Sequence, residues 1–120
     1  MDDKTTIEEL KKLVVKFRDE RDWKKYHNPK DLAADISIES AELQELFLWK
    51  NLDEIKKFTD AKANIEKIKD ELADVVIACL LLADELGIDL SDSVIGKNSK
   101  NSEKYPIEKV KGNYKKYTEL

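Results

Sequence analysis

The sequence predicts an all-α protein, an antiparallel bundle of four main helices. Glycine (3) and proline (2) are scarce, and the abundant Leu, Ile, Ala, Glu and Lys favour helices over a turn-rich β fold. Apolar residues recur three and four positions apart in several segments, which is the helical period. No segment alternates between apolar and polar residues as a half-buried strand does. A chain of 120 residues is long enough to bury one core.

Capping signals define the first two predicted helices. Two overlapping Thr-x-x-Glu boxes at residues 5–9 predict the start of the first helix, and its apolar spacing extends to about Trp23. A short link follows. Asn28 and Pro29 are typical of an N-cap and a first helical residue, so we expect the second helix to run from there to about Trp49.

Breaks and stops define the later elements. A short helix is expected from Asn51 or Leu52 to about Phe58, with a break at residues 59–60. The long third helix should run over 61–86, because Gly87 is a natural C-terminal stop. A fourth helix, capped by residues 89–91, should end near 104–106. The weak periodicity after Pro106 leaves the secondary structure of the last residues open.

Charge and composition exclude several classes of function. The net charge of −4 lacks the basic footprint of a nucleic-acid-binding protein. The single cysteine, Cys79, can form neither an internal disulfide nor a thiolate metal site. The N-terminus is acidic and polar, unlike a signal peptide, and the longest apolar run, residues 75–83, is about half of what a bilayer span requires. We therefore expect a soluble, cytoplasmic protein with no membrane partner.

Two pairs of acidic residues are the candidate chemistry. Glu39 and Glu42 lie three apart in the second predicted helix, and Glu71 and Asp74 lie three apart in the third. Acids at this spacing share one helix face and can direct their carboxylates to one place. Spacing alone is weak, since the chain has 26 acids. On a helical wheel, Glu39 and Glu42 fall at the edge of the apolar face, in an arc that includes Asp35.

The neighbourhood of Glu71 and Asp74 favours a metal site. Both precede a run that is apolar on every side, which implies burial all round that segment. Buried carboxylates repel one another unless a cation compensates them. With no histidine or cysteine ligand nearby, all-oxygen ligation favours Mg²⁺, for which Mn²⁺ should substitute. A solvated acidic stripe paired with Lys67 and Lys69 explains the same periodicity, and periodicity alone leaves both readings open.

The acidic pairs also resemble a known signature. Glu-x-x-Glu followed, after residues 43–70, by Glu-x-x-Asp resembles the metal-binding pattern of the MazG-like all-α NTP pyrophosphatases. The flanking residues are similar to the dCTP pyrophosphatase type of that family. They comprise Arg-Asp-Trp-x-x-Tyr-His-x-Pro at 21–29, Phe47 with Trp49, and Lys-x₃-Asn-x₃-Tyr-Pro at 97–106. The resemblance covers about residues 5–106.

The resemblance assigns roles to individual residues. It implies that the acidic residues bind Mg²⁺, that two tryptophans flank the base, and that four further side chains reach the nucleotide or line its pocket. The metal ligands would be Glu39, Glu42, Glu71 and Asp74; the tryptophans Trp23 and Trp49; and the remaining side chains His27, Lys97, Asn101 and Tyr105. Trp49 lies seven residues after Glu42, two turns along the same predicted helix face. Ala78 occupies a position where the dCTP-selective type carries a tyrosine, which implies a wider pocket.

The resulting functional hypothesis is an Mg²⁺-dependent enzyme. It would hydrolyse a (d)NTP to a (d)NMP and pyrophosphate, with Glu42 as general base. The preferred substrate would be dCTP or a related pyrimidine or modified nucleotide, and the role would be nucleotide-pool housekeeping. We expect one catalytic domain over 1–106 and a tail over 107–120. The apolar third helix implies a homo-oligomer, at least a dimer, and the resemblance favours a tetramer.

Three alternative functions are compatible with parts of the same pattern. A non-catalytic oligomeric helical scaffold would leave the acids merely solvated. A relative acting on phosphoribosyl-ATP would share the family and differ in substrate. A di-iron carboxylate bundle normally needs Glu-x-x-His pairs, and the chain has none.

Overall fold

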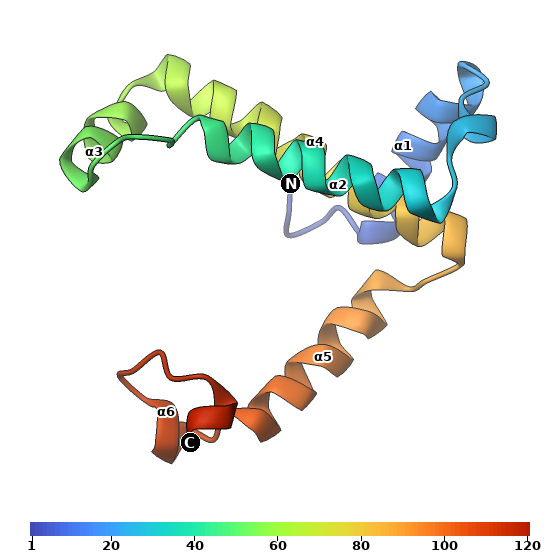
Figure 1. Cartoon of the computed structure of the whole chain (residues 1–120). Helices are drawn as coiled ribbons and strands as arrows, with labels where there is room; N and C mark the ends of the chain where they lie inside the picture. The colour runs from blue at the N-terminus through green and yellow to red at the C-terminus, as the bar shows by residue number, and fades with distance from the viewer. The chain divides into compact units, whose positions relative to one another are not determined.

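The computed structural model describes residues 1–120 and confirms the all-α class, with helices and no strand (Figure 1). The chain forms two compact units, residues 1–87 and residues 88–120. The helices are α1 (Ile7–Glu20), α2 (Pro29–Glu45), α3 (Leu52–Asp60), α4 (Lys62–Leu86), α5 (Leu90–Lys104) and α6 (Ile107–Val110), with short 3₁₀ segments η1 (Lys24–Tyr26) and η2 (Tyr117–Glu119). The predicted division into a domain over 1–106 and a tail stays a prediction.

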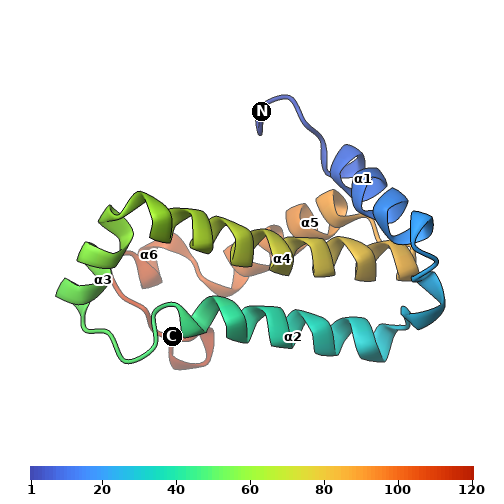
Figure 2. The same cartoon turned by 90° about the horizontal axis from the view of Figure 1, so that it is seen from above.

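The first unit is organised around α4, which contacts α1, α2 and α3. Helices α2 and α4 lie side by side and run in opposite directions (Figure 2). Its most deeply buried apolar side chains are Leu32 on α2 and three residues of α4. Those three are Ala78, Leu80 and Ala83. Because α5 belongs to the second unit, the antiparallel arrangement of four main helices stays a prediction.

The apolar run of α4 is not buried on every side within the first unit. Within this run Val76 and Ile77 remain 42% and 37% exposed. A helix that is apolar all round needs neighbours on all sides. The side of α4 that carries Val76 and Ile77 is not fully covered by the other helices of the first unit.

The predicted helix starts are confirmed by their caps. The side chain of Thr6 accepts from the backbone N–H of Glu9, and the Glu9 side chain accepts from the backbone N–H of Thr6. Asn28 caps α2 by accepting from the backbone N–H of Asp31, with Pro29 as the first helical residue. At the other end of the unit, Gly87 ends α4 in the left-handed conformation, with φ of 64°, which glycine adopts without steric cost.

The predicted end of the first helix was wrong. Helix α1 stops at Glu20 rather than near Trp23. The backbone N–H of Trp23 bonds the carbonyl of Arg18, and that of Asp22 bonds the carbonyl of Asp19, while Asp22 takes a φ of 55°. These two bonds form a Schellman motif. The motif usually contains glycine, and its use of aspartate removed the signal on which the sequence prediction depended.

The predicted end of the second helix was also wrong. Helix α2 stops at Glu45 rather than near Trp49. Residues 46–50 form successive turns, in which a backbone N–H bonds the carbonyl three residues earlier. Lys50 also donates from Nζ to the carbonyl of Leu46. Trp49 itself has a φ of 65°, a conformation that ends a helix. Asn51 then caps α3 through a capping box with Glu54.

The second unit contains α5, α6 and the C-terminal residues. Asp89 caps α5 by accepting from the backbone N–H of Asp92, and α5 ends at Lys104, as expected. After Pro106, where the sequence left the state open, the chain forms α6 and η2. The rings of Tyr105 and Tyr117 pack edge to face at 6.1 Å. No helix of the protein has both the length and the apolar character needed to cross a membrane.

Candidate active site

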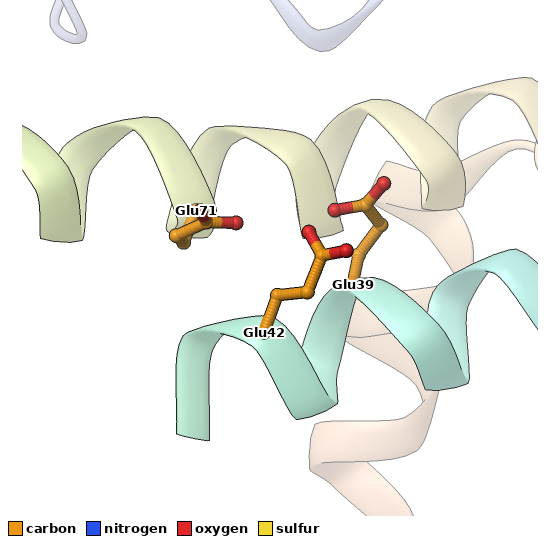
Figure 3. A group of neighbouring side chains, drawn as sticks. All are labelled: Glu39, Glu42 and Glu71. Atoms are coloured by element: carbon orange, nitrogen blue, oxygen red, sulfur yellow. The ribbon is translucent and has the colours of Figure 1, made fainter. Parts of the chain in front are cut away.

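Three of the four predicted metal ligands converge between α2 and α4. Glu39 and Glu42 project from adjacent turns of α2 toward Glu71 on α4 (Figure 3). One carboxylate oxygen from each of the three residues lies within 4.8 Å of the others. The antiparallel packing of two helices, each with acids on its facing side, therefore brings together residues that are far apart in the sequence.

Two oxygens of this carboxylate cluster (Glu39, Glu42 and Glu71) are buried and lack a partner. Oε2 of Glu39 and Oε2 of Glu71 have no hydrogen-bond partner. Leaving a buried acceptor without a donor is costly, and more so for a charged group. The arrangement is thus unfavourable by itself, and a group that accepts electron pairs from these oxygens would relieve it.

The pKa values of Glu39 and Glu71 reflect the same unfavourable burial of carboxylates. Burial, followed by the hydrogen bond to Glu42 and the charges of Glu42, Asp74 and Asp35, raises the pKa of Glu39 to about 7. Burial, followed by the charges of Glu42 and Asp74, also raises the pKa of Glu71. Desolvation and like charges both disfavour the ionised form of an acid. A bound cation would reverse both effects.

Asp74 stands at the edge of this cluster. It is exposed and is not one of the three residues whose oxygens converge, yet its charge acts on both Glu39 and Glu71. It also lines the adjoining cavity. The structure therefore places Asp74 near the cluster without bringing its carboxylate into it.

The cluster fits a hard divalent cation. Its oxygens are close enough to share one ion, two of them are buried acceptors without donors, and no nitrogen or sulphur ligand belongs to the group. Carboxylate-only sites of this kind suit Mg²⁺ or Mn²⁺. The same observations weaken the solvated-stripe reading, because Lys69 pairs with Glu66 rather than with the cluster.

A cavity of about 590 Å³ adjoins the cluster through Asp74. Its volume falls in the usual range for small-molecule sites. The ring of Trp23 packs edge to face on Phe17 at 5.8 Å, and Nδ1 of His27 is buried without a hydrogen-bond partner. The lining residues are Leu13, Val14, Phe17, Arg18, Trp23, His27, Asp35, Asp74, Ile77 and Leu81. A largely apolar cavity with a few polar groups beside a carboxylate cluster can hold a flat base next to a charged tail.

Two charged lining residues, Arg18 and Asp35, were not among the predicted site residues. Arg18 is only 3% exposed and is held by ion pairs to Asp19 and Asp84; nothing in the sequence distinguished it from other arginines. Asp35 lies four residues before Glu39 on α2, so helical periodicity could have identified it. Its helical arc was recognised, but the cavity beside it forms only when α1 packs on α4.

The structure contradicts the predicted position of Trp49. Because α2 ends at Glu45, Trp49 is not on the helix face that carries Glu42. It is 91% exposed and does not line the cavity. Ala78 does not line it either: it is 1% exposed in the core. The wider pocket expected at Ala78 stays a prediction.

The three remaining predicted residues lie in the second unit. Lys97 and Asn101 lie one turn apart on α5 and line a shallow depression of about 420 Å³ with Ser93, Val94 and Asn98. Tyr105 caps the end of α5 and packs against Tyr117. Their role in binding a nucleotide stays a prediction.

Known proteins of similar sequence include mammalian enzymes. The chain is 35% identical to dCTP pyrophosphatase 1 of Mus musculus over 115 residues, which cover 96% of this chain and 68% of that protein. It is 34% identical to dCTP pyrophosphatase 1 of Homo sapiens with the same coverage. These relatives confirm the resemblance to the dCTP pyrophosphatase type.

A solved structure and a family pattern agree with these relatives. The crystal structure of a pyrophosphatase from Archaeoglobus fulgidus superposes with a TM-score of 0.74 at 43% identity, covering 82% of this chain and 91% of that one. The pattern of the MazG-like family matches residues 34–120, which include all four predicted metal ligands. The chain belongs to the MazG-like family.

Proposed function

We propose that this protein is an Mg²⁺-dependent nucleoside triphosphate pyrophosphatase that converts a (d)NTP to a (d)NMP and pyrophosphate. The hydrolase class follows from the relatives and the solved neighbour, all of which are pyrophosphatases. The observation that carries the proposal is the carboxylate cluster between α2 and α4, with its two unpartnered buried oxygens, beside a cavity of nucleotide size.

Glu39, Glu42 and Glu71 would hold the divalent ion, and Asp74 would complete the set from the edge of the cavity. When bound, Mg²⁺ supplies Lewis-acid chemistry: it neutralises phosphate charge and makes water more acidic. Mn²⁺ should replace it, since both are hard, oxygen-preferring ions.

The protein's own residues would do the rest. Glu42 is the most exposed member of the cluster, so one of its oxygens can accept the proton of the attacking water. Trp23 and His27 would hold the base in the cavity, where the apolar walls exclude water. No serine or cysteine lines the cavity, so the reaction would proceed by direct attack of water on the α- or β-phosphorus.

The substrate would be dCTP or a related pyrimidine or modified nucleotide, by analogy with the named relatives. The enzyme would then remove unwanted nucleotides from the cytoplasmic pool. A phosphoribosyl-ATP substrate remains the alternative within the enzyme class. The chain would form a homo-oligomer, a tetramer rather than a dimer.

A pyrophosphate-release assay tests this function. The eight common NTPs and dNTPs and phosphoribosyl-ATP are each incubated with the full chain, with Mg²⁺, with Mn²⁺ and with excess chelator. We expect release from at least one nucleoside triphosphate with either metal and none with chelator. A scaffold would release pyrophosphate under no condition, and a reaction confined to phosphoribosyl-ATP would establish the alternative.

A further inference from the structure

We propose that Asp35 is a specificity-determining residue that selects bases carrying an exocyclic amino group, such as cytosine and adenine. The inference rests on the proposed function, because it concerns which nucleotide occupies the cavity beside the carboxylate cluster. It assigns to Asp35 a contact with the base and no part in binding the metal.

The position of Asp35 separates it from the metal ligands. It lies one helical turn before Glu39 on α2, about 6 Å along the helix axis, toward the end of α2 that follows Trp23 and His27. It lines the cavity together with these two residues, whereas Glu39 and Glu42 do not. Asp35 is not part of the group of converging carboxylates. Its side chain therefore faces the space expected to hold the base rather than the phosphates.

The carboxylate of Asp35 has no partner within the protein. Arg18, the only arginine or lysine among the lining residues, donates from Nε to Asp19 and from Nη1 to Asp84, each over 2.9 Å. Asp35 forms no ion pair, although its side chain is half-buried. An ionised carboxylate can only accept hydrogen bonds. A ligand that fills this cavity must therefore offer Asp35 a donor or leave a desolvated charge unsatisfied.

Among nucleotide groups, the amino group of a base meets this requirement. Cytosine carries N–H donors at C4 and adenine at C6, and aspartate accepts from the amino group of cytosine in known recognition. Uracil, thymine and hypoxanthine present a carbonyl oxygen at the same place, which a carboxylate repels. Sugar hydroxyls are also donors. The apolar and aromatic walls, formed by Phe17, Trp23 and Leu81 among others, match a flat base better than a sugar.

The test compares nucleotides that differ only in this group. The ratio of kcat/KM is measured for dCTP against dUTP and for dATP against dITP, in the wild type and in Asp35→Asn. The wild type should favour the amino member of each pair, and the variant should reduce this preference by about tenfold or more, as expected for loss of one charged base contact. The side-chain amide of an asparagine can donate an N–H to the carbonyl oxygen of uracil, so the variant can bind dUTP. Glu20→Gln, which removes an exposed acid at the end of α1, is the control and should leave both ratios unchanged.

The ratios distinguish this role from effects on the metal cluster. Asp35 acts electrostatically on Glu39, so its loss can change the rate for every substrate, but such a change cancels within each pair. Preserved amino preference in Asp35→Asn would overturn the inference. The ratio of kcat/KM for dCTP against CTP is measured in the same two proteins. A change in Asp35→Asn confined to that ratio would also overturn the inference, because it would place the sugar at Asp35.

A binding measurement separates failure of the inference from failure of the proposed function. Quenching of tryptophan fluorescence is titrated with the α,β-imido analogues of dCTP and dUTP. If the wild type hydrolyses no nucleotide but binds the dCTP analogue better, and Asp35→Asn loses that difference, the inference stands and the function fails. If hydrolysis is observed and the variant keeps the preference in both assays, the function stands and the inference fails.

Discussion

Arg18 on α1 donates a hydrogen bond from Nη1 to Oδ2 of Asp84 on α4 over 2.9 Å. Arg18 is 3% exposed, and its guanidinium also donates from Nε to Asp19. These hydrogen bonds raise the pKa of Arg18, against the opposing effect of burial. The pair joins the two helices whose packing creates the cavity, so the shape of the proposed base pocket depends on it.

Replacing Asp84 by alanine should destabilise the protein by about 1–3 kcal/mol. Removing one partner of a buried pair leaves the other charge without compensation, but Asp84 is partly exposed and Asp19 remains, which reduces the loss. Urea denaturation followed by circular dichroism measures the free energy of unfolding. Glu66→Gln, which breaks the exposed pair with Lys69, is the control and should cost no more than about 0.5 kcal/mol. Equal losses in both variants would show that burial of Arg18 adds nothing.

Replacing a proposed metal ligand should abolish turnover without unfolding the chain. Glu39→Gln and Asp74→Asn each remove the negative charge of a proposed ligand while keeping the side-chain shape. We expect kcat/KM to fall by more than about 100-fold, since even residues that only orient a metal ligand cost 10–100-fold when replaced. The far-ultraviolet circular dichroism spectrum should be unchanged. Full activity in either variant would contradict the assignment of that residue.

The raised pKa of Glu39 predicts how stability depends on pH in the absence of metal. Its carboxyl group ionises near pH 4.5 in the unfolded chain and near pH 7 in the folded one. Between these values the folded state binds more protons, so the contribution of Glu39 to stability falls as pH rises through this window. Thermal unfolding with chelator should therefore give a higher Tm near pH 5 than near pH 8. Glu39→Gln, which cannot ionise, should reduce this difference.

Added Mg²⁺ should restore the folding stability that is lost at high pH. An ion that binds only the folded chain raises its stability, and the ionised cluster at pH 8 binds it best. The rise in Tm on adding Mg²⁺ should be larger at pH 8 than at pH 5 and absent from Glu39→Gln. A non-catalytic scaffold would give no rise at either pH.

Trp49 offers a separate test of function against stability. It adopts a φ of 65° and is 91% exposed, so its ring makes little packing contribution. Trp49→Gly relieves the left-handed strain of about 1–2 kcal/mol but adds about 0.5–1 kcal/mol of unfolded-chain entropy. The free energy of unfolding should change by less than about 1 kcal/mol. If Trp49 stacks on the base, KM should rise about tenfold in Trp49→Gly. Trp49→Phe, which keeps an aromatic ring, should have a KM close to that of the wild type. An unchanged KM in Trp49→Gly would show that Trp49 does not contact the nucleotide.

Exposed apolar residues predict self-association. Leu72 and Val76 on α4 and Leu13 on α1 line an apolar groove of about 580 Å³, and a second copy would cover it. Sedimentation equilibrium should give particles of at least twice 13.9 kDa. Leu72→Glu should shift the mass toward the monomer, whereas Leu52→Glu, at the exposed start of α3, should not. A wild-type mass of 13.9 kDa would rule out the oligomer.

The sequence by itself determined the helical class, the helix starts and the two acidic pairs from which the carboxylate cluster is drawn. These features depend on local rules. Thr6 and Asn28 cap their own helices, Gly87 ends α4, and acids three apart must share a face. Local signals failed where the chain used an uncommon residue for a common conformation, as Asp22 and Trp49 do in the left-handed region.

Only the tertiary structure decided which residues meet. It brought Glu71 within reach of Glu39 and Glu42, left Asp74 at the edge, and removed Trp49 from the expected helix face. The cavity, with Arg18 and Asp35 in its wall, arises where α1 and α2 pack beside α4. The distance between two helix faces depends on how side chains from all three helices fill the space between them. Such packing is not encoded in any one segment.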